Sequence, residues 1–323
     1  MTNDGPPLAF SGSRLAWADM PRDLRSRIAE LAGAAVVAEA PATVGFSPGY
    51  ASLLELGDGT QVFVKAVSPE QNPDSPNLAR AEIRALEALP PGVPAPRLQW
   101  SHDDGTWVVM GITAVAGRSP EHPWTPEQRR RVLDLAAELA RAGTPAPACL
   151  PPLSVALTGL AASTRALAQS PADLDAAVAA MAEDGPWLVE HREDLVRWAE
   201  EAPTAAVGHS LAHNDLRTDN VLLGQDGTWV VDWPHASKDA PAWYDLVGLL
   251  VSIAMQGGGD PDALFWEHPA AAGADRESVR AVLAALTGYF LQGAVQPPPP
   301  GIANLRAFQR AHARAALAWL RRF

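Results

Sequence analysis

The residue types that can do chemistry are concentrated in residues 213–220, which read His-Asn-Asp-Leu-Arg-Thr-Asp-Asn. This stretch runs into Val-Leu-Leu, a Gly-Gln-Asp-Gly turn and a second apolar run that ends at Asp232. Two short apolar runs on either side of such a turn predict a β-hairpin. A tight turn pairs Asn220 with Val231, so the side chains of Asn220 and Asp232 are expected to emerge beside each other at the open end of the hairpin.

The oxygens of these two side chains suit a hard cation. An amide oxygen and a carboxylate held together are ligands of the kind that Mg²⁺ uses beside phosphate groups. Asp215 lies upstream in the loop that leads into the hairpin, where its carboxylate can accept or orient the proton of a hydroxyl group. The pattern predicts a metal-binding pair of side chains with one acidic group held apart from it. The alternative is a polar hairpin loop in which Asp215 is a cap and Asn220 a turn residue.

This arrangement resembles the catalytic loop of kinases, in which His-x-Asp-x-x-x-x-Asn is followed by a metal-binding aspartate. The surrounding residues are similar to those of aminoglycoside phosphotransferases and related small-molecule kinases. They are especially similar to a group of actinobacterial phosphotransferases of unassigned substrate, which carry a Val-Asp-Trp-Pro stretch like residues 231–234. The resemblance implies that Asp215 is the catalytic base and that Asn220 and Asp232 are the magnesium ligands.

The resemblance also implies roles for three nearby residues. His213 would brace the catalytic loop, and Asp245, in a Trp-Tyr-Asp-Leu stretch, would anchor it. Arg217 stands where protein kinases often keep a lysine, so it is a second catalytic candidate that could contact the γ-phosphate. Pro234 replaces the glycine of a protein kinase's Asp-Phe-Gly, and no Ala-Pro-Glu follows. These departures speak against a switchable activation segment and against peptide docking.

Lys65 and Glu82 give an independent indication of the same chemistry. Strand alternation places Lys65 on one face with Phe63 and Val67, and a lysine among apolar neighbours needs a partner or a ligand. Glu82 is the one charge on the apolar arc of a helix predicted over 78–89. In the resemblance, Lys65 binds the α- and β-phosphates and Glu82 positions it. A snorkelling lysine and a border glutamate are the alternative.

Two further segments are candidates for binding the nucleotide. Residues 45–49 read Gly-Phe-Ser-Pro-Gly, and the backbone at Ser47 and Gly49 can cradle phosphate oxygens, although no Gly-Lys-Ser/Thr P-loop follows. The resemblance places the lobe hinge near Met110 and Ile112, whose backbone groups would bind adenine. Without the resemblance, these segments are an ordinary hairpin and a buried edge strand.

The order of the predicted elements indicates an α+β protein of two lobes, protein-kinase-like, with a small strand-rich N-lobe and a larger helical C-lobe. We expect residues 1–110 to form the nucleotide-binding lobe, 111–117 the hinge and 118–323 the C-lobe, with a possible leading helix within 14–40. Strands are predicted over 42–46, 50–56, 61–67, 97–101, 106–112, 220–223 and 228–232. Helices are predicted over 78–89, 173–183, 186–200, 242–255, 276–291 and 304–322, and another begins with the capping box at 125–128.

Composition limits the class of ligand. The 323 residues carry a formal net charge of −12, which disfavours binding to nucleic acid or to an anionic membrane and favours a cationic small molecule. Acidic and tryptophan residues after Asp232 could line an acceptor pocket; they are Asp239, Asp260, Asp262, Glu267 and Asp275, with Trp233, Trp243 and Trp266. The alternative is that the acids serve solubility and the tryptophans pack in the core.

The remaining expectations concern location and partners. Cys149 is the single cysteine, so no internal disulfide can form, and we find no apolar run that predicts a membrane span. With a polar N-terminal segment, these features favour a cytoplasmic protein, either a monomer or a homodimer.

The function expected from the resemblance is transfer of the γ-phosphate of ATP, or of GTP, with Mg²⁺, to a hydroxyl of a small molecule. The acceptor would be an aminoglycoside or another antibiotic, in a resistance role. One alternative is a kinase of a primary metabolite such as choline, homoserine or a sugar. The other is a pseudokinase that binds nucleotide without catalysis. The sequence leaves open the acceptor, the choice of nucleotide and the oligomeric state.

Overall fold

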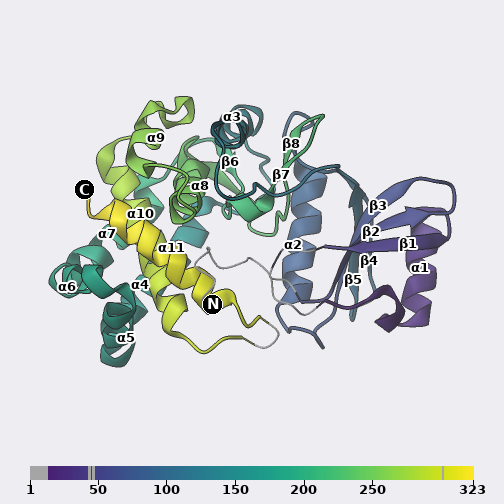
Figure 1. Cartoon of the computed structure of the whole chain (residues 1–323), viewed down its shortest axis with the longest axis horizontal. Coiled ribbons are helices and arrows are strands. Elements are labelled where there is room, and N and C mark those ends of the chain that lie inside the picture. The colour runs from purple at the N-terminus through teal and green to yellow at the C-terminus, as the bar shows by residue number, and fades with distance from the viewer. Residues whose placement is uncertain (1–13, 43–44, 46–47, 300–301) are drawn as a thin grey trace.

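The computed structural model describes residues 14–42, 45, 48–299 and 302–323, and it shows a strand-rich lobe beside a larger helical lobe (Figure 1). The first lobe is built on a five-stranded antiparallel sheet of order β1-β2-β3-β5-β4. Its strands are β1 (Val36–Pro41), β2 (Tyr50–Leu56), β3 (Gln61–Val67), β4 (Leu98–Asp103) and β5 (Val108–Thr113). The predicted α+β class with a strand-rich first lobe is confirmed.

Helices cover both faces of this sheet because its strands alternate in the direction of their side chains. On one face, Ile28 of α1 (Arg22–Ala32) packs in a cluster that includes Val109. On the other face, Leu86 of α2 (Ser75–Ala88) packs in the main core with Met110. Figure 1 shows the sheet between these two helices.

The start of the chain differs from prediction. The proposed leading helix within 14–40 is shorter, because Gly33 takes a left-handed φ of 83° and ends α1 before β1 begins. The strand expected over 42–46 is replaced by β1 at Val36–Pro41, and residues 43–44 and 46–47 lie outside the described part. β5 continues to Thr113, past the predicted lobe boundary at residue 110.

The helical lobe combines nine α-helices with two small strand pairs, counted over the described residues. The helices are α3 (Pro126–Ala142), α4 (Leu153–Gln169), α5 (Pro171–Met181), α6 (Gly185–Glu190), α7 (Arg192–Ala205), α8 (Tyr244–Met255), α9 (Pro261–Glu267), α10 (Arg276–Val295) and α11 (Leu305–Leu320). The strand pairs are β6 (Ser210–Ala212) with β9 (Ser237–Ala240) and β7 (Val221–Leu223) with β8 (Thr228–Val230).

Most of the predicted helices are present with shifted ends. The capping box is confirmed, because the Thr125 hydroxyl accepts a hydrogen bond of 3.2 Å from the backbone N–H of Gln128. The helix expected over 186–200 is divided into α6 and α7 near His191. Helix α4 was not predicted, although Leu153 and Leu157 on it are fully buried.

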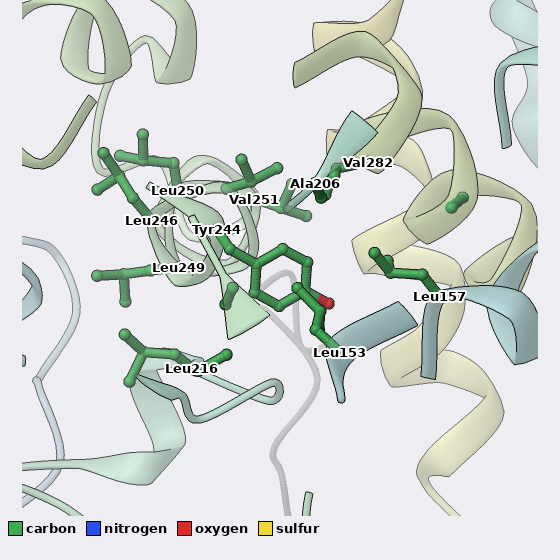
Figure 2. Close-up of a cluster of buried hydrophobic side chains, with 14 of the residues drawn as sticks. Leu153, Leu157, Ala206, Leu216, Tyr244, Leu246, Leu249, Leu250, Val251 and Val282 are labelled. Atoms are coloured by element: carbon green, nitrogen blue, oxygen red, sulfur yellow. The ribbon is translucent and has the colours of Figure 1, made fainter. Parts of the chain in front are cut away.

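The core of this lobe is formed by α4, α7, α8, α10 and α11. Figure 2 shows Leu153 and Leu157 of α4 near Tyr244 and Val282, which come from α8 and α10. By length and composition α10 could span a membrane, which corrects the expectation that no run is long enough. Its apolar residues are buried against neighbouring helices, as in the core helix of a globular protein.

Candidate active site

Two cavities meet between the lobes. The first has a volume of about 640 Å³ and the second about 600 Å³. Their shared lining residues are Gly45, Lys65, Val67, Asp219, Asn220 and Asp232. Asp215 and Arg217 line only the first cavity, whereas Thr113, the last residue of β5, and Val115, just beyond the sheet, line only the second.

Lys65 connects the two lobes through its ammonium group. It lies on β3, and its Nζ donates to both carboxylate oxygens of Glu82, at 2.7 and 2.9 Å. The same Nζ lies 2.8 Å from Oδ1 of Asp232. The predicted contact between Lys65 and Glu82 is present. Burial alone would raise the pKa of Asp232, but the neighbouring Lys65 ammonium lowers it to about 2.

Asp245 holds the start of the catalytic loop. Its carboxylate, at the first turn of α8, accepts hydrogen bonds from the backbone N–H groups of His213, at 2.6 Å, and Asn214, at 2.9 Å. Asn214 has a left-handed φ of 62°, and its side-chain oxygen accepts a hydrogen bond of 2.6 Å from the Tyr244 hydroxyl. These contacts fix a strained residue directly before Asp215.

His213 braces the loop from the other side. Its Nε2 lies 3.1 Å from the carbonyl oxygen of Val231, and its ring packs edge-on against Trp233, with centroids 4.6 Å apart. The imidazole is fully buried, and burial lowers its pKa to about 4. The contacts expected of His213 and Asp245 are therefore both present.

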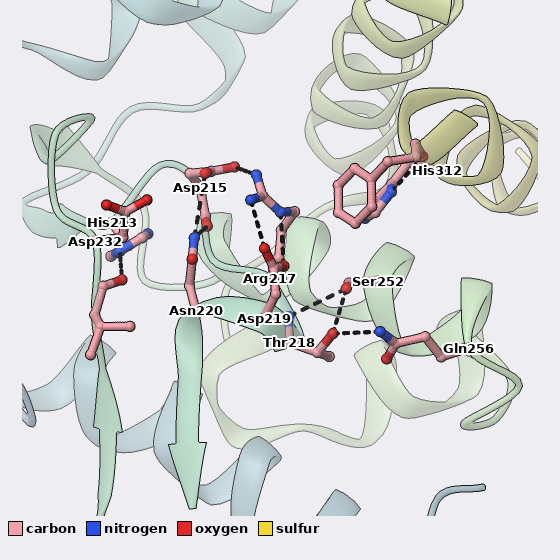
Figure 3. Close-up of polar contacts among 12 residues, drawn as sticks. His213, Asp215, Arg217, Thr218, Asp219, Asn220, Asp232, Ser252, Gln256 and His312 are labelled. Carbon is pink, nitrogen blue, oxygen red and sulfur yellow. Dashed lines mark hydrogen bonds and ion pairs between the residues drawn. The ribbon is translucent and has the colours of Figure 1, made fainter. Parts of the chain in front are cut away.

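Arg217 is clamped between two carboxylates (Figure 3). Its Nε and Nη2 donate in parallel to the two oxygens of Asp219, at 3.0 and 2.9 Å, and its Nη1 donates to Oδ1 of Asp215. Burial raises the pKa of Asp215, and the Arg217 charge opposes this rise. Asp219 was not predicted as the partner of Arg217, although the alternation Asp-x-Arg-x-Asp over residues 215–219 was the signal available in the sequence.

The end of the catalytic loop, at Thr218, is held by residues on and just after α8. The hydroxyl groups of Thr218 and Ser252 lie 2.9 Å apart, and Nε2 of Gln256 donates to the Thr218 hydroxyl at 2.8 Å. Figure 3 shows this group beneath Arg217. The loop that carries Asp215 is thus held by α8 at both of its ends.

The donor atoms of Asn220 and Asp232 fit a magnesium ion. Nδ2 of Asn220 donates to the carbonyl oxygen of Asp215 at 2.9 Å, which leaves the amide oxygen available as a ligand. Asp232 uses Oδ1 for Lys65 and retains Oδ2. Within the described ranges, no group of three or more histidine, cysteine or acidic residues could hold a metal. Two protein oxygens completed by phosphate and water oxygens are typical of Mg²⁺.

The two residues predicted to contact adenine at the hinge, Met110 and Ile112, lie inside the sheet. Met110 and Ile112 lie in β5 with β3 on one side and β4 on the other, so the sheet uses their backbone groups. This pairing corrects the backbone role assigned to them. The side chain of Ile112 lines the second cavity, and Val115 is the first residue beyond the sheet to do so.

The phosphate-loop candidates are only partly described. Ser47 lies outside the described residues, whereas Gly49 has a φ of 134°, and a Cβ there would come within 2.9 Å of the Ala66 carbonyl oxygen. Gly49 itself lines neither cavity, although the neighbouring Gly45 lines both. Arg14, a cation that was not predicted from the sequence, also lines the second cavity, and its backbone forms an isolated β-bridge with Gly49.

The acidic residues predicted to line an acceptor pocket do not line the two cavities. They are Asp239, Asp260, Asp262, Glu267 and Asp275. Asp260 pairs with Arg322, and Asp275 caps α10. In Figure 1, α9, which lies next to Asp260, is far from the sheet lobe.

The three candidate tryptophans belong to the packing of the C-lobe. Trp233 is fully buried, and Trp243 and Trp266 both pack edge-on against Phe265. None of the three lines the cavities. The alternative reading of these residues, that they pack in the core, is the correct one.

Comparison with known proteins agrees with this geometry. A model described as the phosphotransferase enzyme family matches residues 44–282. A thermostable mutant of aminoglycoside phosphotransferase APH(4)-Ia, in a ternary complex with ADP and hygromycin B, is similar with a TM-score of 0.60 and 15% identity, over 92% of this chain and 98% of that chain.

Other solved structures show the same fold. Spectinomycin phosphotransferase, APH(9)-Ia, in complex with ADP and spectinomycin, has a TM-score of 0.57 and 12% identity, over 93% of this chain and 98% of that chain. An aminoglycoside phosphotransferase from Alicyclobacillus acidocaldarius has a TM-score of 0.52 and 15% identity, over 89% of this chain and 92% of that chain. No curated protein matches the chain.

Proposed function

This chain belongs to the phosphotransferase enzyme family, and from that premise we propose that it transfers the γ-phosphate of ATP, or of GTP, to a hydroxyl group of a small molecule with the help of Mg²⁺. The observation that carries the proposal is the division of residues between the two cavities. Asp215 lines one cavity, the chain beyond β5 lines the other, and the phosphate-handling residues Lys65, Asn220 and Asp232 lie where they meet.

Each group has a separate task in this proposal. The second cavity takes the nucleoside, and backbone groups near Val115 contact its base. Lys65 binds the phosphates while Glu82 fixes the position of its ammonium. The oxygens of Asn220 and Asp232 would hold Mg²⁺, which would supply positive charge against the phosphates.

The acceptor hydroxyl occupies the first cavity beside Asp215. As its oxygen forms a bond to the γ-phosphorus, the bond between that phosphorus and the β–γ bridging oxygen breaks, and the hydroxyl proton passes to the Asp215 carboxylate. Asp245 and Asn220 hold Asp215 in place through the loop backbone. Positioning and electrostatic stabilisation supply most of the catalysis in such transfers.

Two alternatives follow from the same fold. The structural neighbours include complexes with hygromycin B and spectinomycin, but at their identities the likeness concerns the fold and leaves a metabolite acceptor equally open. A pseudokinase is disfavoured, because Lys65, Glu82, Asp215, Asn220 and Asp232 all line the same cleft.

The proposal is tested by nucleotide consumption that depends on both Mg²⁺ and an acceptor. ATP and GTP are each supplied with aminoglycosides, macrolides, cyclic-peptide antibiotics, choline, amino alcohols and sugars, and the phosphorylated product is identified by its mass. Thermal stabilisation by Mg²⁺ and AMP-PNP is measured alongside. Absence of both stabilisation and turnover contradicts the proposal.

A further inference from the structure

One wall of the first cavity is largely apolar. It is formed by α4, α10 and the chain from residue 302 into α11, where Tyr289 and Gln309 contribute polar groups and the apolar side chains are Leu160, Leu286, Phe290, Ile302, Leu305 and Phe308. Phe308 joins this wall to the catalytic loop, because the Arg217 guanidinium lies 5.2 Å from the centroid of its ring. The apolar surface therefore begins beside the residues assigned to phosphoryl transfer.

Four of the five carboxylates that line this cavity take part in ion pairs, in which two cations are each shared by two carboxylates. Lys65 pairs with two of them and Arg217 with the other two. Asp74, exposed at the start of α2, is the one lining carboxylate to which the described residues supply no ion pair. A polycationic acceptor would have to place several ammonium groups against apolar side chains, which costs free energy when no carboxylate replaces the lost water.

We propose that the acceptor is a hydroxylated molecule with an extended apolar or aromatic face and few positive charges, seated on this wall with its hydroxyl at Asp215. The inference rests on the proposed function and specifies its substrate class. It replaces the cationic acceptor expected from composition. The cavity volume of about 640 Å³ lies within the range of about 300–1,000 Å³ that accommodates drug-sized ligands. Burial of an apolar face against such a wall supplies binding free energy without ion pairs.

The test compares an apolar alcohol with a polycation on one protein. Binding of the fluorescent alcohol naphthylethanol and of hygromycin B is measured in the presence of Mg²⁺ and AMP-PNP. Leu160→Asp places a carboxylate on the wall, and Ile302→Asp does so from a different segment. Val155→Asp is the matched control, because Val155 lies on the same helix as Leu160, is 64% exposed and does not line the cavity.

We expect naphthylethanol to bind the wild type saturably and more tightly than hygromycin B. Each wall variant should weaken naphthylethanol binding by about tenfold or more, because a charge replaces apolar contact, and should strengthen hygromycin B binding. The Val155→Asp protein should match the wild type. Tighter binding of hygromycin B to the wild type, or equal naphthylethanol affinity in wild type and wall variants, would overturn the inference.

Thermal stabilisation by Mg²⁺ and AMP-PNP separates this outcome from failure of the proposed function. If the nucleotide stabilises the wild type and both wall variants, but naphthylethanol does not bind, the acceptor class is wrong and the phosphotransferase proposal stands. If the nucleotide does not stabilise the wild type, the phosphotransferase proposal fails, and with it the premise of the acceptor inference.

Discussion

The Lys65 ammonium on the sheet lobe lies 2.8 Å from Oδ1 of Asp232 on the helical lobe. The same ammonium binds both oxygens of Glu82, so one cation serves two carboxylates from different parts of the chain. This contact places Asp232 where the two cavities meet. Asp232 therefore has two partners in the proposed function, the lysine and the magnesium ion.

Asp232→Ala is expected to abolish the magnesium-dependent part of nucleotide binding. The variant loses the carboxylate oxygen assigned to the metal, whereas Lys65 keeps Glu82 and can still attract phosphate. Calorimetric titration with AMP-PNP, with and without Mg²⁺, measures the effect. Asp226→Ala, in the exposed turn of the same hairpin, is the control. If Mg²⁺ raised the affinity for AMP-PNP as much in the Asp232 variant as in the wild type, the assignment of Asp232 as a ligand would be contradicted.

Asp215→Asn is expected to lower turnover of any accepted substrate by about 10²–10⁴-fold. The amide has nearly the same shape and cannot take the hydroxyl proton. Nucleotide affinity should stay unchanged, since Asp215 lies outside the second cavity. Single-turnover kinetics with saturating nucleotide give the rate, and thermal stabilisation by AMP-PNP gives the binding control. Full activity in this variant would remove Asp215 from the mechanism.

The residues that could be predicted from the sequence are those placed by local geometry. A tight turn sets the positions of Asn220 and Asp232, and the strand and helix periods identify Lys65 and Glu82 as charges on apolar faces. In the structure all four line the first cavity. Short-range rules were sufficient for Lys65 and Glu82, whose directions are set by β3 and α2. The strands predicted over 220–223 and 228–232 are shorter, because Asn220 ends a 3₁₀ turn before β7 and Asp232 lies beyond β8 with a left-handed φ of 70°.

The elements and cavity residues that could not be predicted depend on contacts between segments that are distant in the sequence. Helix α4 follows a proline-rich segment, and its position is decided by packing against α7 and α10. Strands β6 and β9 are short, and each is formed by pairing with the other, although the catalytic loop and β7 and β8 separate them in the sequence. The apolar wall of the first cavity combines residues from α4, α10 and α11, which are far apart in the sequence. Net charge favours a cationic acceptor, but it cannot show where the acids lie.

Arg217 and Asp219 are expected to be energetically coupled. Their side chains are 15% and 11% exposed, so removing one partner leaves a largely buried charge. Asp219→Leu should destabilise the fold by about 3 kcal/mol, and the double variant Arg217→Met with Asp219→Leu should cost less than the sum of the single changes. Urea unfolding of the four proteins measures the coupling free energy.

The exposed pair of Arg130 and Glu127 on α3 is the matched control for this cycle. These side chains are 60% and 65% exposed, so solvent screens their charges and their coupling should be much weaker than that of Arg217 with Asp219. Equal coupling for the two pairs would show that burial does not set the strength of the Arg217 contact.

His213 should make the stability of the protein fall as the solution becomes acidic. Burial lowers its pKa from 6.5 to about 4, so the unfolded chain takes up a proton at a higher pH than the folded one. The contribution of His213 to the free energy of unfolding is therefore complete above about pH 6.5. It is lost as the pH falls toward 4, at up to about 1.4 kcal/mol per pH unit.

The variant His213→Phe tests this pH dependence because a phenyl ring can retain the edge-on packing against Trp233. At pH 7 the variant should be less stable, since the contact with the Val231 carbonyl is lost. Between about pH 6.5 and 4, its unfolding free energy should decline less steeply than that of the wild type, and the two curves should converge. Urea unfolding at a series of pH values gives both curves. Parallel curves over this range would mean that His213 is not held neutral by the fold.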